Sequence, residues 1–148
     1  MSLLNYTTTV PVHRTLGQVT ELLVKAGARQ MMTEYAADGA PTGLTFAIAV
    51  EGGAVAFSLP VHVHRVVAVM QKDRRIPPRY RTPEQGERVA WRIMKDWLEA
   101  QLAIVATEMV TLDQVMLPYM RTTDGGTFYE DYVAGVAPLP AMAAGSGA

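Results

Sequence analysis

The chain has 148 residues, of which 49% are apolar, and its formal net charge at pH 7 is −1. This length and composition predict one folded domain with a substantial core, and they argue against a disordered chain or a general polyanion binder. The absence of cysteine excludes disulfides, thiolate catalysis and cysteine-ligated metal sites. Neither a signal-peptide pattern nor an apolar run long enough for a membrane span is present, so we expect a cytoplasmic protein.

The first part of the chain predicts a helix between two strands. Residues 6–12 are rich in threonine and valine, which is typical of a strand. Thr15 and Gln18 form a helix-capping pattern, and apolar residues at helical spacing continue up to Gly27, a usual helix-terminating residue. A second strand is expected over residues 29–35, followed by an Ala-Asp-Gly-Ala-Pro turn.

The next segment carries the clearest hairpin pattern. Bulky side chains alternate with small ones on both sides of a Glu-Gly-Gly turn: Leu44, Phe46, Ile48 and Val50 before it, and Val55, Phe57 and Leu59 after it. The bulky face must be buried, and the small-residue face would accommodate a helix or a second subunit. Residues 60–70 then predict a helix, although their many valines are poor helix formers.

The second half of the chain is dominated by one long predicted helix. Thr82 is its expected N-cap, with Pro83 at the first helical position and Gln85 at the third, and apolar residues recur at helical spacing to residue 105. Thr111 repeats the capping pattern and starts a short helix that Pro118 closes.

The C-terminal part is expected to contain a hairpin and a tail. Residues 119–123 and 127–132 flank an Asp-Gly-Gly turn, and residues 137–148 form an Ala/Gly/Pro-rich tail after a single domain over residues 1–136. The order β-α-β-β-β-α predicts an α+β fold, in which helices frame a small antiparallel sheet and one long helix lies in the C-terminal half.

Positive charge is concentrated before and within the long helix. Residues 60–95 contain nine Lys or Arg and three acids, so this segment carries +6 and the rest of the chain −7. Residues 72–81, Lys-Asp-Arg-Arg-Ile-Pro-Pro-Arg-Tyr-Arg, lead into the positive end of the helix dipole, and arginine forks suit phosphate. The alternative is a solvated linker, with Arg88 and Arg92 paired to Glu84 and Asp96 along the helix.

The expected ligand contacts divide into phosphate-binding arginines and aromatic rings that would stack on a base. Primary phosphate contacts are expected from Arg74, Arg75, Arg79, Arg81 and Arg121, secondary ones from Arg65 and Arg92, and stacking from Trp91, Tyr80 or Tyr119. Trp91 and Trp97 lie on opposite sides of the helix, which favours a core position for Trp97 and an interface or ligand position for Trp91. Because both sides are apolar, we expect a second copy to cover one of them in a homodimer or higher oligomer.

The motifs of common enzymes are missing. The sequence has no phosphate-binding glycine loop and no dinucleotide fingerprint, and Gly-Ser-Gly at residues 145–147 lacks the context of a nucleophile elbow. His62 and His64 have no evident third ligand, so neither a metal site nor a cofactor is expected. The carboxylate pairs Glu84/Glu87 and Glu130/Asp131 are explained by a helix N-terminus and a solvated turn. We therefore expect a protein that is not an enzyme.

Four stretches, residues 6–12, 57–60, 89–102 and 117–120, together resemble a widespread family of small phage and prophage proteins over most of residues 5–132. The order of elements is also similar to that of phage anti-Thoeris sponges. Those proteins are non-enzymatic oligomers that capture cyclic ADP-ribose-type signals and, in some members, cyclic oligonucleotides. No binding residue is carried over from either resemblance.

The leading hypothesis is a phage-type, non-enzymatic oligomer that sequesters a small phosphorylated (cyclic) nucleotide immune signal in the infected bacterial host cell. The alternative is a single-stranded nucleic-acid-binding or annealing protein of a phage, which would use the same arginines along a groove. A third possibility is a protein inhibitor that docks the basic loop onto an acidic host enzyme.

Overall fold

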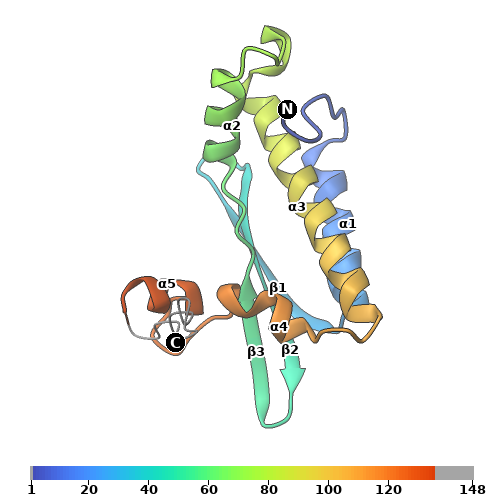
Figure 1. Cartoon of the computed structure of the whole chain (residues 1–148), viewed down its shortest axis with the longest axis vertical. Helices are drawn as coiled ribbons and strands as arrows, with labels where there is room; N and C mark the ends of the chain where they lie inside the picture. Colours follow the sequence, from blue (N-terminus) through green and yellow to red (C-terminus); the bar gives the residue numbers. More distant parts are fainter. Residues whose placement is uncertain (1, 136–148) are drawn as a thin grey trace, which may run out of the picture.

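A three-stranded antiparallel sheet lies against two long helices in the computed structural model, which describes residues 2–135 (Figure 1). The strands are β1 (Ala28–Tyr35), β2 (Pro41–Val50) and β3 (Gly53–Ser58), paired in the order β1-β2-β3. The helices α1 (Val12–Lys25) and α3 (Pro83–Ala106) run side by side, and α2 (Val63–Lys72) packs on the first part of α3. The predicted α+β class, with a small antiparallel sheet and one long helix, is confirmed.

Four short elements complete the described chain: η1 (Pro78–Tyr80), α4 (Leu112–Met116), η2 (Leu117–Tyr119) and α5 (Phe128–Val133). No helix within residues 2–135 has both the length and the hydropathy needed to cross a membrane. The predicted tail over residues 137–148 lies outside the described residues.

The main core forms where the bulky face of the sheet meets α1, α3 and α4. Phe46 of β2 pairs with Phe57 of β3, and their rings stack with centroids 5.3 Å apart. Leu23 of α1 and Leu98 of α3 close over this face and are fully buried. The alternation predicted for the hairpin is confirmed where the strands lie under the helices, because Leu44, Phe46, Phe57 and Leu59 are buried, whereas Val50 beside the turn is exposed. Each fully buried apolar side chain contributes about 1.5–3 kcal/mol.

A second, smaller core joins the N-terminal segment, α2 and α3. Its buried members are Met70, Ile76 and Val89, and Leu3, Tyr6 and Tyr80 pack against them. The side-chain amide of Gln85 donates to the carbonyl oxygens of Tyr6 and Thr8, both at 2.9 Å. This cluster fixes the loop between α2 and α3 against the rest of the domain.

The strand predicted over residues 6–12 is wrong. The segment begins with a turn, and its carbonyl groups accept hydrogen bonds from Gln85 instead of a neighbouring strand. Helix α1 starts at Val12, directly after Pro11, so the expected N-cap Thr15 lies within the first turn and is fully buried. The end of the helix is as predicted, since Gly27 adopts a φ of 104° that favours glycine.

The predicted start of the long helix is confirmed. The hydroxyl of Thr82 accepts from the backbone N–H of Gln85 at 3.2 Å, and Pro83 opens a helix of 24 residues. The second cap is also as predicted, because Thr111 and Gln114 make both hydrogen bonds of a capping box. Helix α4 ends at Met116 and passes directly into η2, whose second residue is Pro118.

The predicted C-terminal hairpin is wrong, because neither residues 119–123 nor residues 127–132 form a strand. Only a single bridge between Arg121 and Thr127 forms, and residues 128–133 are the helix α5. The hydroxyl of Thr127 accepts from the backbone N–H of Glu130 at 3.3 Å, which caps this helix. A Thr-x-x-Glu capping pattern therefore outweighs the strand preference of the aromatic residues that follow it.

Most of the apolar surface of α3 is covered within the chain. One side, with Trp91, Met94 and Leu98, is buried in the main core. On the other side, Ile93 packs in the smaller core, and Trp97 meets the ring of Tyr119 edge to face at 5.7 Å. Trp97 is half-buried against the core, as predicted. The expected dimer through α3 is not supported, because these apolar side chains are already covered within the chain.

Candidate ligand site at the basic loop

The basic loop, residues 72–81, is held in shape by its own side chains and by one buried anchor. The carboxylate of Asp73 accepts two hydrogen bonds from Arg75, at 2.9 and 3.1 Å. Arg81 donates through Nε to the carbonyl oxygen of Ile76 at 2.8 Å, and the Ile76 side chain is fully buried. Two of the predicted phosphate ligands, Arg75 and Arg81, thus have hydrogen-bond partners within the loop. These hydrogen bonds hold the loop in one conformation.

Arg74 and Arg79 are the exposed arginines that remain available on this loop. Neither makes a salt bridge or a side-chain hydrogen bond within residues 2–135. The guanidinium of Arg79 lies 4.7 Å from the centre of the Tyr80 ring, so the ring supports it from one face. Lys72, in the last turn of α2, adds a third exposed cation at the start of the loop.

Tyr80 is half-buried and belongs to the smaller core. Its ring meets that of Tyr6 edge to face at 5.6 Å, while Arg79 covers one of its faces. Its main role in the fold is therefore to anchor the loop. The predicted stacking of Tyr80 on a base stays a prediction.

The prediction that Trp91 contacts a ligand or an interface is wrong. Its side chain is 0% exposed, and its indole N–H donates to the carbonyl oxygen of Pro41 at 3.1 Å. The sheet covers the side of α3 that carries Trp91, so this ring belongs to the core and has no free face.

Arg92 lies away from the loop and joins two helices. Its guanidinium donates to the side-chain oxygens of Thr15, at 3.4 Å, and Gln18 on α1. Arg88 donates to Gln85 at 2.9 Å, so neither arginine makes the helical ion pair considered from the sequence. Arg92 is thus a contact between α1 and α3, and its expected role as a secondary phosphate ligand is not supported.

Three further predicted residues are not brought to the loop. Tyr119 packs on Trp97, and Arg121 pairs beside β3, where its backbone N–H donates to Ala56 at 2.8 Å. The segment between α4 and α5, which contains both residues, lies in the lower half of the view in Figure 1, whereas the loop after α2 lies at the top. Arg65 is exposed in the first turn of α2, roughly 10 Å along the helix from its last residue at about 1.5 Å per residue. The predicted grouping of Tyr119 and Arg121 with the loop is wrong for this fold, whereas the role of Arg65 as a secondary contact stays a prediction.

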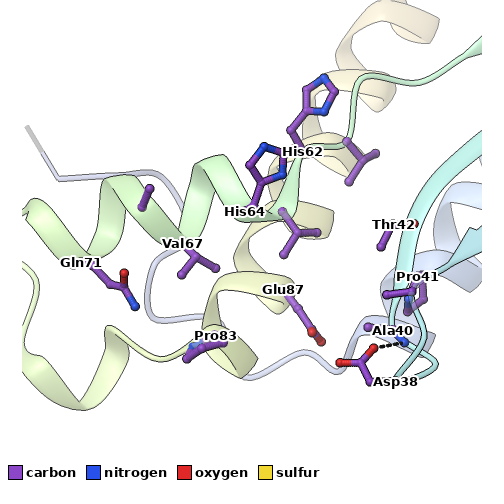
Figure 2. Close-up of a pocket in the computed structure, with 14 residues that line it drawn as sticks. Asp38, Ala40, Pro41, Thr42, His62, His64, Val67, Gln71, Pro83 and Glu87 are labelled. Atoms are coloured by element: carbon purple, nitrogen blue, oxygen red, sulfur yellow. Dashed lines mark hydrogen bonds between the residues drawn. The ribbon is translucent and has the colours of Figure 1, made fainter.

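A groove of about 570 Å³ opens at the base of the basic loop (Figure 2). It lies between α2, the start of α3 and the turn that joins β1 to β2. Gln71 and Pro83, which line it, flank the loop: Gln71 directly precedes it, and Pro83 follows it after Thr82. Sequence reasoning missed this site because its polar lining, Asp38, His62, His64 and Glu87, comes from three separate parts of the chain.

One end of the groove is acidic. Figure 2 shows the carboxyl groups of Asp38 and Glu87 facing each other at one end. Partial burial raises the pKa of Glu87, the charges of Asp38 and Glu84 raise it further, and Arg88 lowers it. A phosphate would be repelled here, so the candidate anion site is the loop and not the groove. Residues 2–135 contain no group of three His, Cys, Asp or Glu placed to hold a metal ion.

The raised pKa of Glu87 predicts a pH-dependent effect on stability. Ionised Glu87 costs stability in the folded state at pH 7, and this cost disappears as the pH falls through its raised pKa toward the ordinary value of 4.5. Glu87→Gln is therefore expected to raise the free energy of unfolding at pH 7, by less than about 1 kcal/mol because solvent screens the charges. Urea unfolding of both proteins between pH 7 and 4 should show the difference shrinking. A difference that grows toward acid pH would contradict this account of Glu87.

The assignment of the site depends on the residues of this chain alone. Comparison of the chain with protein-family models, with curated proteins and with solved structures finds no match. The site has two neighbouring features. One is the basic loop, with exposed arginine side chains, and the other is the groove at its base, whose lining includes two carboxylates.

Proposed function

We propose that the protein is a non-enzymatic binder of a small phosphorylated ligand, with the basic loop as the phosphate site. One observation carries the proposal. The loop uses Arg75 and Arg81 to hold its own shape and leaves Arg74 and Arg79 exposed, without an acidic partner in the described part of the chain. Arginines on a braced loop lose little conformational entropy when they bind, and their forks match phosphate oxygens.

The specific form of this proposal is a phage-type sponge that sequesters a small phosphorylated (cyclic) nucleotide and so counteracts host anti-phage defence. The compact loop suits a small ligand with one or two phosphates better than a long polyanion. A single-stranded nucleic acid is the second candidate, and it would show a steep loss of affinity with added salt because several counterions are released together.

A homodimer or higher oligomer remains part of the proposal, through a surface other than α3. The face of the sheet that points away from the core carries the small residues Ala47, Ala49, Ala54 and Ala56 together with Met32, which is 59% exposed. None of these residues belongs to the hydrophobic core. This open face would allow close approach of a second copy.

Arg74→Ala combined with Arg79→Ala tests the site. We expect this pair of substitutions to weaken binding of cyclic ADP-ribose or a cyclic dinucleotide by at least about tenfold, because each arginine makes a charge-assisted contact worth about 1.5–3 kcal/mol. Isothermal titration calorimetry measures the affinity. Unfolding in urea should be almost unchanged, because both side chains are exposed.

The matched control is Arg29→Ala combined with Arg121→Ala. It makes the same change in net charge with two exposed arginines outside the loop. Equal losses of affinity in both double variants would show that only net charge matters and would reject the loop as the site.

A further inference from the structure

The groove at the base of the loop has the size of a small-molecule site. Its volume of about 570 Å³ falls within the range of about 300–1,000 Å³ that is usual for ligand pockets. Three elements form its walls: the β1–β2 turn, one side of α2 and the first turns of α3 (Figure 2). Close packing of α2 on α3 fixes the position of one wall, because Gly86 leaves room for Val67.

Most of the wall is apolar. Aliphatic side chains line it from α2, from the segment before α2 and from the β1–β2 turn: Ala36, Ala40, Val61, Val63, Val67 and Ala68. These side chains offer no hydrogen bonds, so they favour the hydrocarbon or aromatic body of a ligand.

The titratable groups of the groove lie in two places, and Thr42 and Gln71 are the other polar residues of its lining. The carboxyl groups of Asp38 and Glu87 converge at one end, and His62 and His64 lie at the opposite rim (Figure 2). One oxygen of Asp38 accepts from the backbone N–H of Ala40 at 3.0 Å. Arg88, the neighbour of Glu87, donates to Gln85 instead. Neither carboxylate has a salt-bridge partner in residues 2–135.

We propose that this groove binds an organic cation, an ammonium, amidinium or guanidinium group on an apolar body, with the charged group held between Asp38 and Glu87. Two convergent carboxylates without a cation of their own supply the charge complementarity, and the aliphatic walls hold the body of the ligand. This site is separate from the phosphate site of the loop and does not depend on it.

Benzamidine is a suitable probe because its neutral isostere, benzamide, has almost the same shape. We expect amide NMR spectra of the protein to show that benzamidine shifts signals of residues 36–42, 61–71 and 83–87, whereas benzamide binds roughly tenfold more weakly or not at all. Equal binding of the two compounds would reject charge recognition. Absence of benzamidine binding at concentrations up to about 10 mM, well above the 1 mM scale of weak binding, would reject the site.

Substitutions of the two carboxylates test whether they bind the charged group of the ligand. Asp38→Asn combined with Glu87→Gln is expected to lower benzamidine affinity by roughly tenfold, and benzamide titrations should be unchanged. Glu84→Gln is the matched control, because Glu84 lies on the same turn of α3 and does not line the groove. A loss of affinity for Glu84→Gln as large as that for the double variant would indicate a diffuse acidic surface and overturn the proposal.

The source of the natural cation is tested separately. N-acetyl-arginine amide and agmatine present the same guanidinium, the first as part of a peptide unit and the second as a free amine. Tighter binding of N-acetyl-arginine amide would indicate that the natural ligand is an arginine of a protein partner. Tighter binding of agmatine would indicate a metabolite. Both results support a cation site, whereas failure of both to displace benzamidine contradicts it.

Discussion

Replacing Trp91 with alanine is expected to lower the free energy of unfolding by about 3–5 kcal/mol, the usual cost of truncating a buried aromatic side chain. Trp91 is among the largest fully buried side chains and packs in the main core between α3 and the sheet. The substitution also leaves the carbonyl oxygen of Pro41 without its donor. Urea unfolding followed by circular dichroism measures the loss.

Trp91→Phe is the control for this prediction. It keeps an aromatic ring and removes only the indole N–H and part of the volume, so a smaller loss of about 1–3 kcal/mol is expected. A fully stable Trp91→Ala protein that had lost only ligand binding would show instead that Trp91 is a ligand contact. That result would contradict its position in the core.

Gly86→Ala is expected to destabilise the protein by about 1–3 kcal/mol through overpacking. A Cβ atom at Gly86 would stand 2.3 Å from Cγ2 of Val67 and 3.4 Å from the Val67 Cα atom. The strain should exceed the gain of up to about 1 kcal/mol that alanine brings to a helix interior. Because Val67 lines the groove, the substitution should also disturb the wall formed by α2.

Two further variants isolate the contact between Gly86 and Val67. In the double variant, Val67→Ala should remove most of the clash, so the two changes should be non-additive by at least about 1 kcal/mol. Gly17→Ala in α1 is the matched helix control, since a Cβ atom there meets nothing within 4 Å. It should raise stability by about 0.4–1 kcal/mol. Additive effects at Gly86 and Val67 would mean that α2 does not pack closely on α3.

The elements that could be predicted from the sequence are those with strong local patterns. Thr82 and Pro83 mark the start of α3, and the alternation around Phe46 and Phe57 marks the hairpin and its buried face. The strand predicted over residues 6–12 does not form. The threonines and valines of this segment are typical of a strand, but its hydrogen-bond partner, Gln85, lies far along the chain. Local preference cannot reveal such a partner.

The candidate site was only partly predictable, for two physical reasons. The loop is continuous in sequence, so its positive charge can be predicted from the sequence. The hydrogen bonds by which Arg75 and Arg81 hold its shape depend on the folded backbone. The sequence does not predict the burial of Trp91, because both sides of α3 are apolar and only the tertiary structure shows which of them the sheet covers. The groove unites Asp38 and Glu87 from distant segments with no shared spacing, so no pattern indicated it.

A native mass spectrum of the purified protein, recorded alone and then with cyclic ADP-ribose, a cyclic dinucleotide and a short single-stranded DNA, tests the central claim most directly. The account predicts an oligomer that gains a stoichiometric mass of one small nucleotide per site, and the gain should be lost in the variant with Arg74→Ala and Arg79→Ala. A protein that ignores the small nucleotides and takes up the DNA would contradict the account and favour a nucleic-acid-binding function. A protein that takes up neither would also contradict it, and would leave a protein partner for the basic loop.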